Sequence, residues 1–187
     1  MPVQSAVAPP LTRPDRGREI ARSTISIAPP RGTDAADVHA LVADCPPLDR
    51  NSLYANLLQC THFATTCALA RRRDDVVGWV SGYLPPDKTS TYFLWQVAVR
   101  DDARGQRLPL RLVRDILARP VCREVRYLET TITPDNSASW ALFESIAAWL
   151  SAPLRRKVHF EREAHFRGRH EPEVLVTIGP FSPPRLN

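Results

Sequence analysis

The sequence predicts an α/β (α+β) protein with a mixed, mostly antiparallel sheet that is flanked by helices on both faces. Three observations predict this class. Three strand-like stretches between residues 63 and 99 are separated by short connections. Residues 108–117 and 133–150 repeat apolar side chains every three or four positions, as helices do. The β-branched stretch VRYLETTI lies between those two helices and is typical of a buried strand.

The composition is that of an ordinary globular domain. The chain has 187 residues, of which 43% are hydrophobic and 24% are charged. Residues 1–22 are rich in proline and arginine and lack a hydrophobic period, so we expect a disordered extension there. We expect a single domain over residues 23–181, followed by a short tail at residues 182–187.

Charge and hydropathy limit the partners and the location. The net charge is +5 and the pI is about 9.4, which favours anionic ligands. The basic residues are scattered rather than interleaved with aromatic residues, so nucleic acid is not expected as a partner. No apolar run approaches the ~20 residues of a membrane span. No secretory signal is visible, so we expect a cytoplasmic protein that does not bind a membrane.

The first part of the domain predicts one strand and two helices. TISIA, residues 24–28, alternates like a strand, and two prolines end it. A helix follows with Thr33 as a plausible N-cap and ends at Pro46 and Pro47. A second helix begins after the loop that contains LDRNS, residues 48–52. The four cysteines lack Cys-x-x-Cys spacing, so we expect small buried hydrophobes in a reducing compartment.

The rest of the domain predicts a meander followed by a crossover. FATTCALAR, DDVVGWVSGYLPP and TYFLWQVAV are three consecutive strands, and their short connections favour antiparallel pairing. A helix over residues 108–117 then leads to the strand at 125–132, which favours parallel pairing of that strand with the last meander strand. The helix at 133–150 is capped by Thr133 or Asn136. A short strand near Val158 and a longer one at 174–178 complete the chain.

The stretch RDDARGQRLPLRL, residues 100–112, connects the end of the last meander strand to a helix. Anionic cofactors bind at this place in open α/β sheets, because amide groups at a helix N-terminus converge on the anion. Gly105 permits a close approach. The backbone amides able to donate are those of Arg104, Gly105, Gln106, Arg107 and Leu108. A solvated basic helix face is the competing interpretation.

This order of elements resembles the GNAT superfamily of acetyl-CoA-dependent N-acetyltransferases. The family pattern after its fourth strand is Arg/Gln-x-x-Gly-x-Gly/Ala, and this chain has RGQRLP at residues 104–109. Arg104 matches the pattern, whereas Arg107 and Pro109 occupy the two glycine positions. The resemblance implies acetyl-CoA as co-substrate. The two departures imply weaker or slightly displaced binding, although the Arg107 side chain could itself meet a phosphate.

A closer resemblance covers roughly residues 25–181. The chain is similar to the diaminobutyrate acetyltransferases of the ectoine pathway in the following ordered stretches: PPLDRNSLYANLLQCTHFATTC, VVGWVSGYLPP, FLWQVAV, ETTITPDNSASWALF and HFRGRHEPE. This resemblance implies acetyl transfer to the 4-amino group of L-2,4-diaminobutyrate, a step toward a compatible solute, and it suggests a homodimer. The alternatives are a catalytically weakened acetyl-CoA-binding module and an enzyme that acts on another small diamine.

A substrate with two ammonium groups favours carboxylates in its pocket. Asp49 lies in the loop between the first two helices, which in this fold borders the substrate cleft, or it caps the second helix. Glu129 lies in an apolar strand, where a carboxylate is costly unless it is paired or half exposed in a cleft. A solvent-facing edge position is the alternative for Glu129. His170 and Glu173 lie in HEPE, and an ordinary hydrogen-bonded loop is the alternative for both.

Binding and proton transfer require further side chains. The residues expected to bind the substrate are Asp49, Asn51, Tyr54, Trp95, Thr131, His170 and Glu173. Trp95 is either a core residue or a wall against the substrate's methylene groups. An alkyl amine is only about 0.1% neutral at pH 7, so a base has to accept its proton. Glu129, His170 and Glu173 are the candidate bases, and no metal is expected because the histidine spacing is not that of a metal site.

The resemblance also implies cofactor contacts. Backbone N–H groups near a bulge in the fourth strand, around Val97, would stabilise the oxyanion, and Val97, Ala98 and Val99 would pair with the pantetheine arm. Asn136 and Ser139 match positions that face the cofactor, or they cap a helix. Many members have a tyrosine acid where this chain has Phe143. Tyr54 is another possible donor, and a thiol with a pKa near ~8.5 can leave without an acid.

Overall fold

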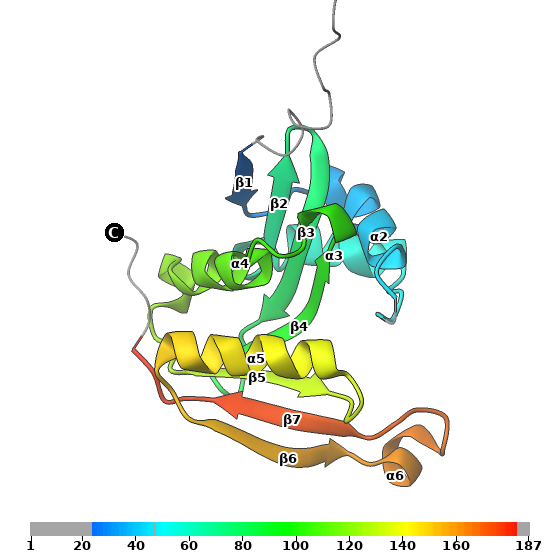
Figure 1. Ribbon diagram of the computed structural model, residues 1–187, viewed down its shortest axis with the longest axis vertical. Coiled ribbons are helices and arrows are strands. Elements are labelled where there is room, and N and C mark those ends of the chain that lie inside the picture. Colours follow the sequence, from blue (N-terminus) through cyan, green and yellow to red (C-terminus); the bar gives the residue numbers. More distant parts are fainter. Residues whose placement is uncertain (1–23, 47, 183–187) are drawn as a thin grey trace, which may run out of the picture.

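The structure is a computed structural model that describes residues 24–46 and 48–182. The extension predicted at residues 1–22 and residues 183–187 of the predicted tail lie outside the described residues. The described part of the chain forms one continuous seven-stranded sheet with helices on both faces (Figure 1).

The sheet is mixed and mostly antiparallel, as predicted. Its order is β1-β2-β3-β4-β5-β7-β6, and β4–β5 is the parallel pair. The bounds of the strands are β1 Ile25–Ala28, β2 Ala68–Arg72, β3 Asp75–Tyr83, β4 Thr91–Val99, β5 Tyr127–Ile132, β6 Leu154–Phe160 and β7 Glu173–Ile178. The antiparallel β2–β3–β4 meander and the helical crossover from β4 to β5 are both confirmed.

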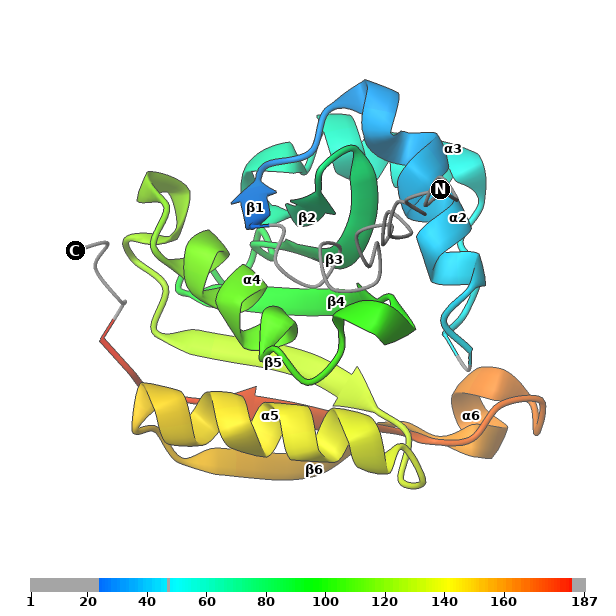
Figure 2. The same ribbon diagram turned by 45° about the horizontal axis from the view of Figure 1, so that its top comes forward.

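The helices divide between the two faces of the sheet. Helices α2 (Ala35–Ala43) and α3 (Leu53–Thr61) lie on one face, and α4 (Leu108–Leu117) and α5 (Ser137–Leu150) lie on the other (Figures 1 and 2). A separate buried apolar cluster fills each side. Helix α4 begins with a proline in its first turn and buries one apolar stripe against the sheet, which explains why its apolar residues repeat every three to four positions.

The structure corrects one predicted helix start and decides between two candidates at another. The prediction that Thr33 caps the first helix is wrong. A 3-10 turn spans Gly32–Asp34, and the Asp34 carboxylate accepts from the Arg31 amide at 2.8 Å. For α5, the structure decides between the two candidate caps, because the Asn136 side chain accepts from the Ser139 amide at 3.0 Å.

The strands and the C-terminal segment also differ from expectation. The stretch predicted as a strand from residue 63 begins with a 3-10 turn at Ala64–Thr66, and β2 starts only at Ala68. The short strand near Val158 extends over seven residues as β6, because it pairs along the length of β7. Helix α6 (Arg162–Phe166) was not predicted, since five residues are too few to show a helical period.

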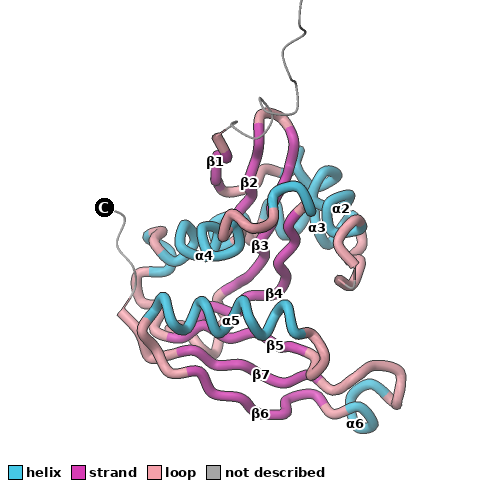
Figure 3. The backbone as a smooth tube through the Cα atoms, in the orientation of Figure 1, coloured by secondary structure: helices cyan, strands magenta, loops and turns pink. Residues whose placement is uncertain are grey.

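Strands β4 and β5 separate toward their carboxyl ends. Their pairing runs only from Thr91 opposite Tyr127 to Phe93 opposite Glu129, although β4 continues to Val99 and β5 to Ile132. Figure 3 shows the first four strands and the last three running in different directions from this point. Within the described residues, the edge of β4 that faces β5 therefore has no strand partner over its last residues.

A bulge in β4 lies beside this separation. The β3 partners of Leu94 and Gln96 are consecutive residues, so Trp95 is an extra residue on β4. The bulge reverses the in-and-out alternation of the strand. Leu94 belongs to the cluster under α4 and α5, whereas Ala98 belongs to the cluster under α2 and α3. Gln96, two positions before Ala98, therefore faces the α2–α3 side.

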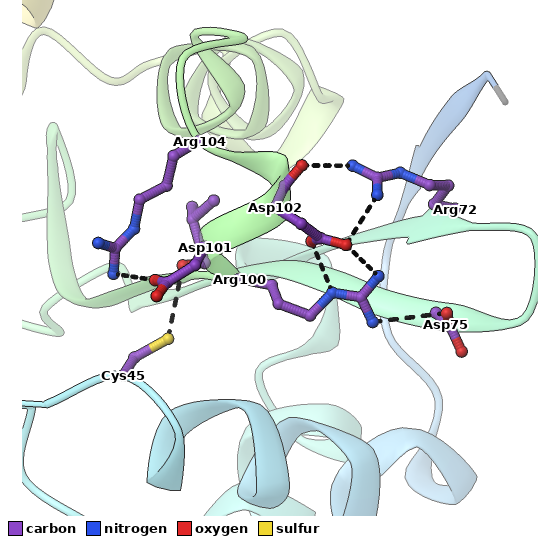
Figure 4. Close-up of polar contacts among 8 residues, drawn as sticks. Cys45, Arg72, Asp75, Arg100, Asp101, Asp102 and Arg104 are labelled. Carbon is purple, nitrogen blue, oxygen red and sulfur yellow. Dashed lines mark hydrogen bonds and ion pairs between the residues drawn. The ribbon is translucent and has the colours of Figure 1, made fainter. Parts of the chain in front are cut away.

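An ion-pair cluster holds the connection between β4 and α4 (Figure 4). The buried Arg72 on β2 donates to the Asp102 carboxylate at 3.1 Å and to the Asp102 carbonyl at 3.2 Å. Arg100 donates to the same carboxylate at 2.8 and 3.1 Å, and to Asp75 at 3.4 Å. Asp102 thus ties this connection to two strands. Hydrogen bonds from Arg100, followed by the charges of Arg100 and Arg72, lower the pKa of Asp102.

Asp102→Asn is expected to lower the free energy of unfolding at neutral pH by about 1 kcal/mol, because the carboxylate is half exposed and its ion pairs are screened by water. A carboxyl whose pKa is lowered on folding contributes stability above its unfolded pKa, about 3.9, and loses it as the pH falls through the folded value. Urea unfolding from pH 7 to pH 3 should therefore show the difference from wild type shrinking below about pH 4.

Asp101→Asn is the matched control for Asp102→Asn. Among residues 24–46 and 48–182, the Asp101 side chain forms its one ion pair with Arg104 at 2.8 Å, and both side chains are exposed. An exposed pair of this kind contributes little to stability. An equal loss of stability in both variants would contradict the anchoring role of Asp102.

Candidate active site

A cavity of about 780 Å³ lies where β4 and β5 separate. Its walls come from the loop after α2, the bulged part of β4, the end of β5, the start of α5 and the segment from α6 to β7. The lining residues are Leu48, Asp49, Asn51, Trp95, Gln96, Thr131, Ile132, Thr133, Asp135, Asn136, Ser137, Ala138, Arg162, Arg169, His170, Glu171 and Glu173. In Figure 2 the loop after α2 points toward α6, and both segments contribute lining residues.

The structure brings most of the predicted substrate residues to this cavity. The residues that line it are Asp49, Asn51, Trp95, Thr131, His170 and Glu173, which come from four separate segments. Tyr54 is not among the lining residues, and its side chain is 68% exposed on α3. The substrate-binding residues predicted from sequence therefore converge, with Tyr54 as the exception within the described chain.

Glu129 has a different environment from the other candidate bases. It is buried on β5 but does not line the cavity. Its carboxylate accepts from Lys88 at 3.0 Å and from the Thr177 hydroxyl at 3.3 Å. Sequence reasoning correctly required a partner for a carboxylate in this apolar strand, and Lys88 from the β3–β4 loop supplies it.

Glu173 is the half-buried carboxylate of the cavity. It is the first residue of β7, and its side chain is 19% exposed. Burial raises the pKa of Glu173. The Thr131 hydroxyl and then His170 lower the pKa in part, and the nearby negative charge of Asp49 raises it further. Glu173 is therefore a carboxylate whose ionised form would be stabilised by a cation entering the cavity.

His170 lies beside Glu173 with one ring nitrogen directed toward it. Nδ1 lies 2.6 Å from the Glu171 carbonyl oxygen, which can only accept, so Nδ1 carries the proton in this bond. In the neutral ring Nε2 is then unprotonated, and it lies 4.0 Å from the Glu173 carboxylate. The ring also packs on Phe166 of α6, with their centroids 4.7 Å apart. The pair offers two proton acceptors on one side of the cavity.

The charge of the cavity favours a cationic ligand. Four carboxylates line it, those of Asp49, Asp135, Glu171 and Glu173, against the two guanidinium groups of Arg162 and Arg169. Arg162 pairs with Glu171 at 2.9 Å. Among the described residues no cation lies within ion-pair distance of Asp49 or Asp135. Trp95, half exposed at the bulge, adds an aromatic wall of the kind that packs against methylene and ammonium groups.

Sequence reasoning missed several of the lining residues. Gln96, Asp135, Arg162, Arg169 and Glu171 line the cavity but were not among the expected site residues. Gln96 had a usable signal, because an amide in an apolar strand is costly unless it is bonded, the same argument that was applied to Glu129. The two arginines had no signal, since their position depends on the unpredicted helix α6.

The β4–α4 connection keeps the geometry of an anion-binding turn. Gly105 has φ of 75° and Arg107 has φ of 52°, so two residues of this turn are in the left-handed region. The first-turn amides of α4 lack partners within the helix, and Pro109 removes one of them. Arg104 pairs with Asp101 at the surface. The left-handed backbone at Arg107 gives a physical reason for glycine at this position in the resembling family.

The remaining expected cofactor residues lie around the separation of β4 and β5. Val97, Ala98 and Val99 are on the part of β4 that, in the described part of the chain, has no strand partner on the β5 side. The bulge falls at Trp95, two residues before Val97. Asn136 lines the cavity and caps α5 through Ser139. Phe143 is buried in the core at 3% exposure, about two turns from that cap.

None of the four cysteines lines the cavity. All four cysteines are buried and free, as expected, and burial raises the pKa of Cys67 to about 12. Within residues 24–46 and 48–182, no group of three or more His, Cys, Asp or Glu side chains is placed to hold a metal ion. The helices described here include none that is both long enough and apolar enough to cross a membrane.

Comparison with known proteins gives concordant matches. Residues 35–148 match the model of the acetyltransferase (GNAT) family. The chain is 49% identical over 157 residues to the L-2,4-diaminobutyric acid acetyltransferase of Methylotuvimicrobium alcaliphilum, covering 84% of this chain and 91% of that protein. It is 48% identical over 160 residues to the enzyme of the same name from Halomonas elongata, covering 85% and 83%.

A solved structure shows the same fold at a high level of similarity. The diaminobutyrate acetyltransferase EctA from Paenibacillus lautus, solved in complex with its substrate L-2,4-diaminobutyric acid and coenzyme A, superposes with a TM-score of 0.81. The two sequences are 34% identical, and the match covers 85% of this chain and 96% of that one.

Proposed function

Because this chain belongs to the acetyltransferase (GNAT) family, we propose that it transfers acetyl from acetyl-CoA to the 4-amino group of L-2,4-diaminobutyrate. The product is N4-acetyl-L-2,4-diaminobutyrate, a precursor in ectoine synthesis. The observation that carries this proposal is the acid-rich cavity at the separation of β4 and β5. It places four carboxylates and an indole next to the free strand edge, which suits a small molecule with two ammonium groups.

The chemistry is direct attack of the amine in a ternary complex. The neutral 4-amino nitrogen forms a bond to the thioester carbonyl carbon, the carbon–sulfur bond breaks, and coenzyme A leaves as its thiolate. One proton leaves the amine, and one proton is taken up by the thiolate. Since a free thiol has a pKa near ~8.5, the thiolate can leave without a side-chain acid. The burial of Phe143 at the family's tyrosine position is compatible with this route.

His170 and Glu173 are the proposed proton acceptors. In the neutral ring of His170, which lines the cavity, Nε2 is unprotonated because Nδ1 donates to the Glu171 carbonyl. The Glu173 carboxylate lies 4.0 Å from Nε2 and would hold the substrate ammonium or receive its proton through water. Asp49 is proposed to bind the ammonium that does not react. Neutral amine is only about 0.1% of the total at pH 7, so a poised acceptor raises the reactive fraction.

The chain's own backbone fits an acetyl-CoA ligand. The unpaired edge of Val97–Val99 can receive the pantetheine amides as an added strand would. The amides from Gly105 to Leu108 lie at the N-terminus of α4, where the pyrophosphate charge is favourable. The amide of Val97, just after the bulge, is proposed as the oxyanion donor. Asn136 and Ser139 at the start of α5 complete the proposed cofactor contacts.

Arg107→Gly is expected to raise the melting temperature by about 2–4 °C, because a glycine adopts the left-handed backbone of this position without strain. The KM for acetyl-CoA is expected to fall by less than about tenfold. The bulky side chain no longer obstructs the phosphates, and loss of the guanidinium offsets part of that gain.

Arg73→Gly is the matched control for Arg107→Gly. Arg73 has φ of 57° in the β2–β3 turn, away from the cofactor loop. It should give a similar rise in melting temperature with an unchanged KM for acetyl-CoA. A lower melting temperature for Arg107→Gly would contradict the strain argument. A raised KM would show that the Arg107 guanidinium is the stronger phosphate ligand.

The proposed reaction is tested by thiol release from acetyl-CoA with L-2,4-diaminobutyrate, ornithine, lysine and no amine. Release that is fastest with diaminobutyrate supports the assignment. Faster release with ornithine or lysine would identify another small diamine as the substrate. Binding of acetyl-CoA without release for any amine would favour a weakened binding module, which Arg107, Pro109 and Phe143 make worth testing.

A homodimer acting in the cytoplasm, with a role in osmoprotection, belongs to the same proposal. Aromatic side chains gather around the end of β3 and the first half of β4, where Tyr83 lies 6.3 Å from Phe63, 5.3 Å from Phe93 and 6.4 Å from Trp95 between ring centroids. Half-exposed aromatic groups of this kind are typical of interfaces. Sedimentation velocity at micromolar concentration should give the mass of two chains, and a monomer would contradict the dimer.

A further inference from the structure

Gln96 occupies a buried position between the two parts of the proposed site. Its residue is 7% exposed, and the bulge at Trp95 turns its side chain to the α2–α3 side of the sheet. The next three residues of β4 form the free edge proposed for the pantetheine arm. A polar side chain buried here is costly unless its amide is fully bonded, so its partners are informative.

Both ends of the Gln96 amide bond to the loop that carries the substrate residues. Nε2 donates to the Asp49 carbonyl oxygen at 2.9 Å. Oε1 accepts from Nδ2 of Asn51 at 3.1 Å. Asp49 and Asn51 both line the cavity, and the Asp49 side chain is exposed on a loop that begins with prolines. The Gln96 amide therefore fixes two residues of a loop that has no secondary structure of its own.

A second tie joins the beginning of the same loop to the same strand. The Cys45 thiol donates to the Val99 carbonyl oxygen at 3.5 Å. The loop is thus attached to β4 at residues 96 and 99, on either side of the strand residues proposed to meet the thioester. Sulfur is a weak donor, so the Gln96 contacts dominate this attachment.

We propose that Gln96 is a positioning residue that holds Asp49 and Asn51 in register with the cofactor-binding edge of β4. This rests on the proposed function. Gln96 acts through these two residues. The consequence is that diaminobutyrate binding, more than acetyl-CoA binding, depends on an amide that is buried in the neighbouring strand.

Gln96→Met tests this inference, because methionine has similar length and removes both hydrogen bonds. Loss of two such bonds is expected to raise the KM for diaminobutyrate about tenfold, with the KM for acetyl-CoA changed less than about twofold. Gln96→Glu keeps the acceptor for Asn51 but sets an acceptor-only carboxylate oxygen against the Asp49 carbonyl, so its KM for diaminobutyrate is expected to rise at least as much as in Gln96→Met. If Gln96→Met only impaired folding, the activity with respect to both substrates would fall equally and their KM values would not diverge.

Ser81→Ala is the matched control. Ser81 is fully buried directly across from Gln96 on β3, and its hydroxyl has no hydrogen-bond partner among the described residues. Removing the Ser81 hydroxyl alters the same buried region but removes no contact with the loop that contains Asp49 and Asn51. Both KM values are expected to remain within about twofold of wild type, since an unpaired hydroxyl contributes no bond to lose.

Hydrogen exchange gives a readout that does not need turnover. Amides of residues 48–51 should exchange faster in Gln96→Met than in Ser81→Ala, while the core of β3 is unchanged. Equal exchange in the two variants, or an equal rise in both KM values, would overturn the positioning role. If the wild type does not acetylate diaminobutyrate, the proposed function fails, and the exchange result still decides the role of Gln96.

Discussion

Glu173→Gln is expected to lower kcat/KM for diaminobutyrate by about a hundredfold to ten-thousandfold, the range lost when a general base is removed. Glutamine keeps the shape of the side chain and its bond to Thr131, but it can neither take a proton nor balance an ammonium charge. The loss should fall mainly on kcat if Glu173 takes the proton, directly or through His170. Steady-state thiol release over a range of both substrates measures this division.

The stability of the same variant separates chemistry from folding. Burial raises the pKa of Glu173, so the ionised carboxylate is disfavoured in the folded protein. A carboxyl of this kind reduces stability as the pH rises from its unfolded to its folded pKa, and the reduction persists at neutral pH. Glu173→Gln removes this reduction, so thermal unfolding at pH 7 should show an unchanged or higher melting temperature.

Glu129→Gln discriminates between the two buried glutamates. Glu129 is held by Lys88 and Thr177 outside the cavity, so the same substitution there is expected to change kcat/KM less than about threefold. A larger loss of kcat/KM in Glu129→Gln than in Glu173→Gln would indicate that the general base is on β5. It would contradict the cavity as the place of proton transfer. The pH profile adds a second criterion. Wild-type activity should decline on the acidic side as Glu173 is protonated, and this limb should be absent in Glu173→Gln.

The sequence was sufficient for the parts of the fold that depend on local patterns. The meander, the crossover helix and the strand at 125–132 are each encoded by periodicity and short connections, and all three form as predicted. The full length of β6 depends on pairing with β7, which no local pattern records, and the five residues of α6 are too few to show a helical period. Arg162 and Arg169 lie in and just after α6 and were missed for that reason, whereas His170 and Glu173 of the same segment were predicted.

For single residues of the candidate site, too, the local sequence predicted the residue types, whereas strand pairing determines their positions. The acids were found from the needs of a diamino substrate, but their convergence depends on the bulge at Trp95. Without that extra residue, Gln96 would face the α4 side, and the loop with Asp49 would have no anchor on β4. Alternation of apolar residues in FLWQVAV does not show a bulge. The pairing register with β3 reveals it.

Asp49 lines the cavity from the loop that Gln96 attaches to β4. Asp49→Asn is expected to raise the KM for diaminobutyrate about thirtyfold, the scale of one hydrogen bond to a charged group, with kcat changed less than about threefold. The Gln96 bond is to the Asp49 carbonyl, so the substitution leaves the loop attached. Asp44→Asn, at the exposed end of α2 and outside the cavity, is the matched control and should leave both constants unchanged.

Two measurements show which ammonium group of the substrate the Asp49 carboxylate binds. With 4-aminobutyrate, which lacks the second ammonium group, Asp49→Asn and wild type should give similar KM values, because the proposed partner of Asp49 is absent. An equal rise in KM for 4-aminobutyrate and for diaminobutyrate would instead indicate that Asp49 binds the reacting amine. The charge of Asp49 also raises the pKa of Glu173, after burial as the main cause. The acidic limb of the pH profile should therefore move to lower pH in Asp49→Asn. An unmoved limb would mean that these two carboxylates are not coupled, and that Glu173 owes its raised pKa to burial alone.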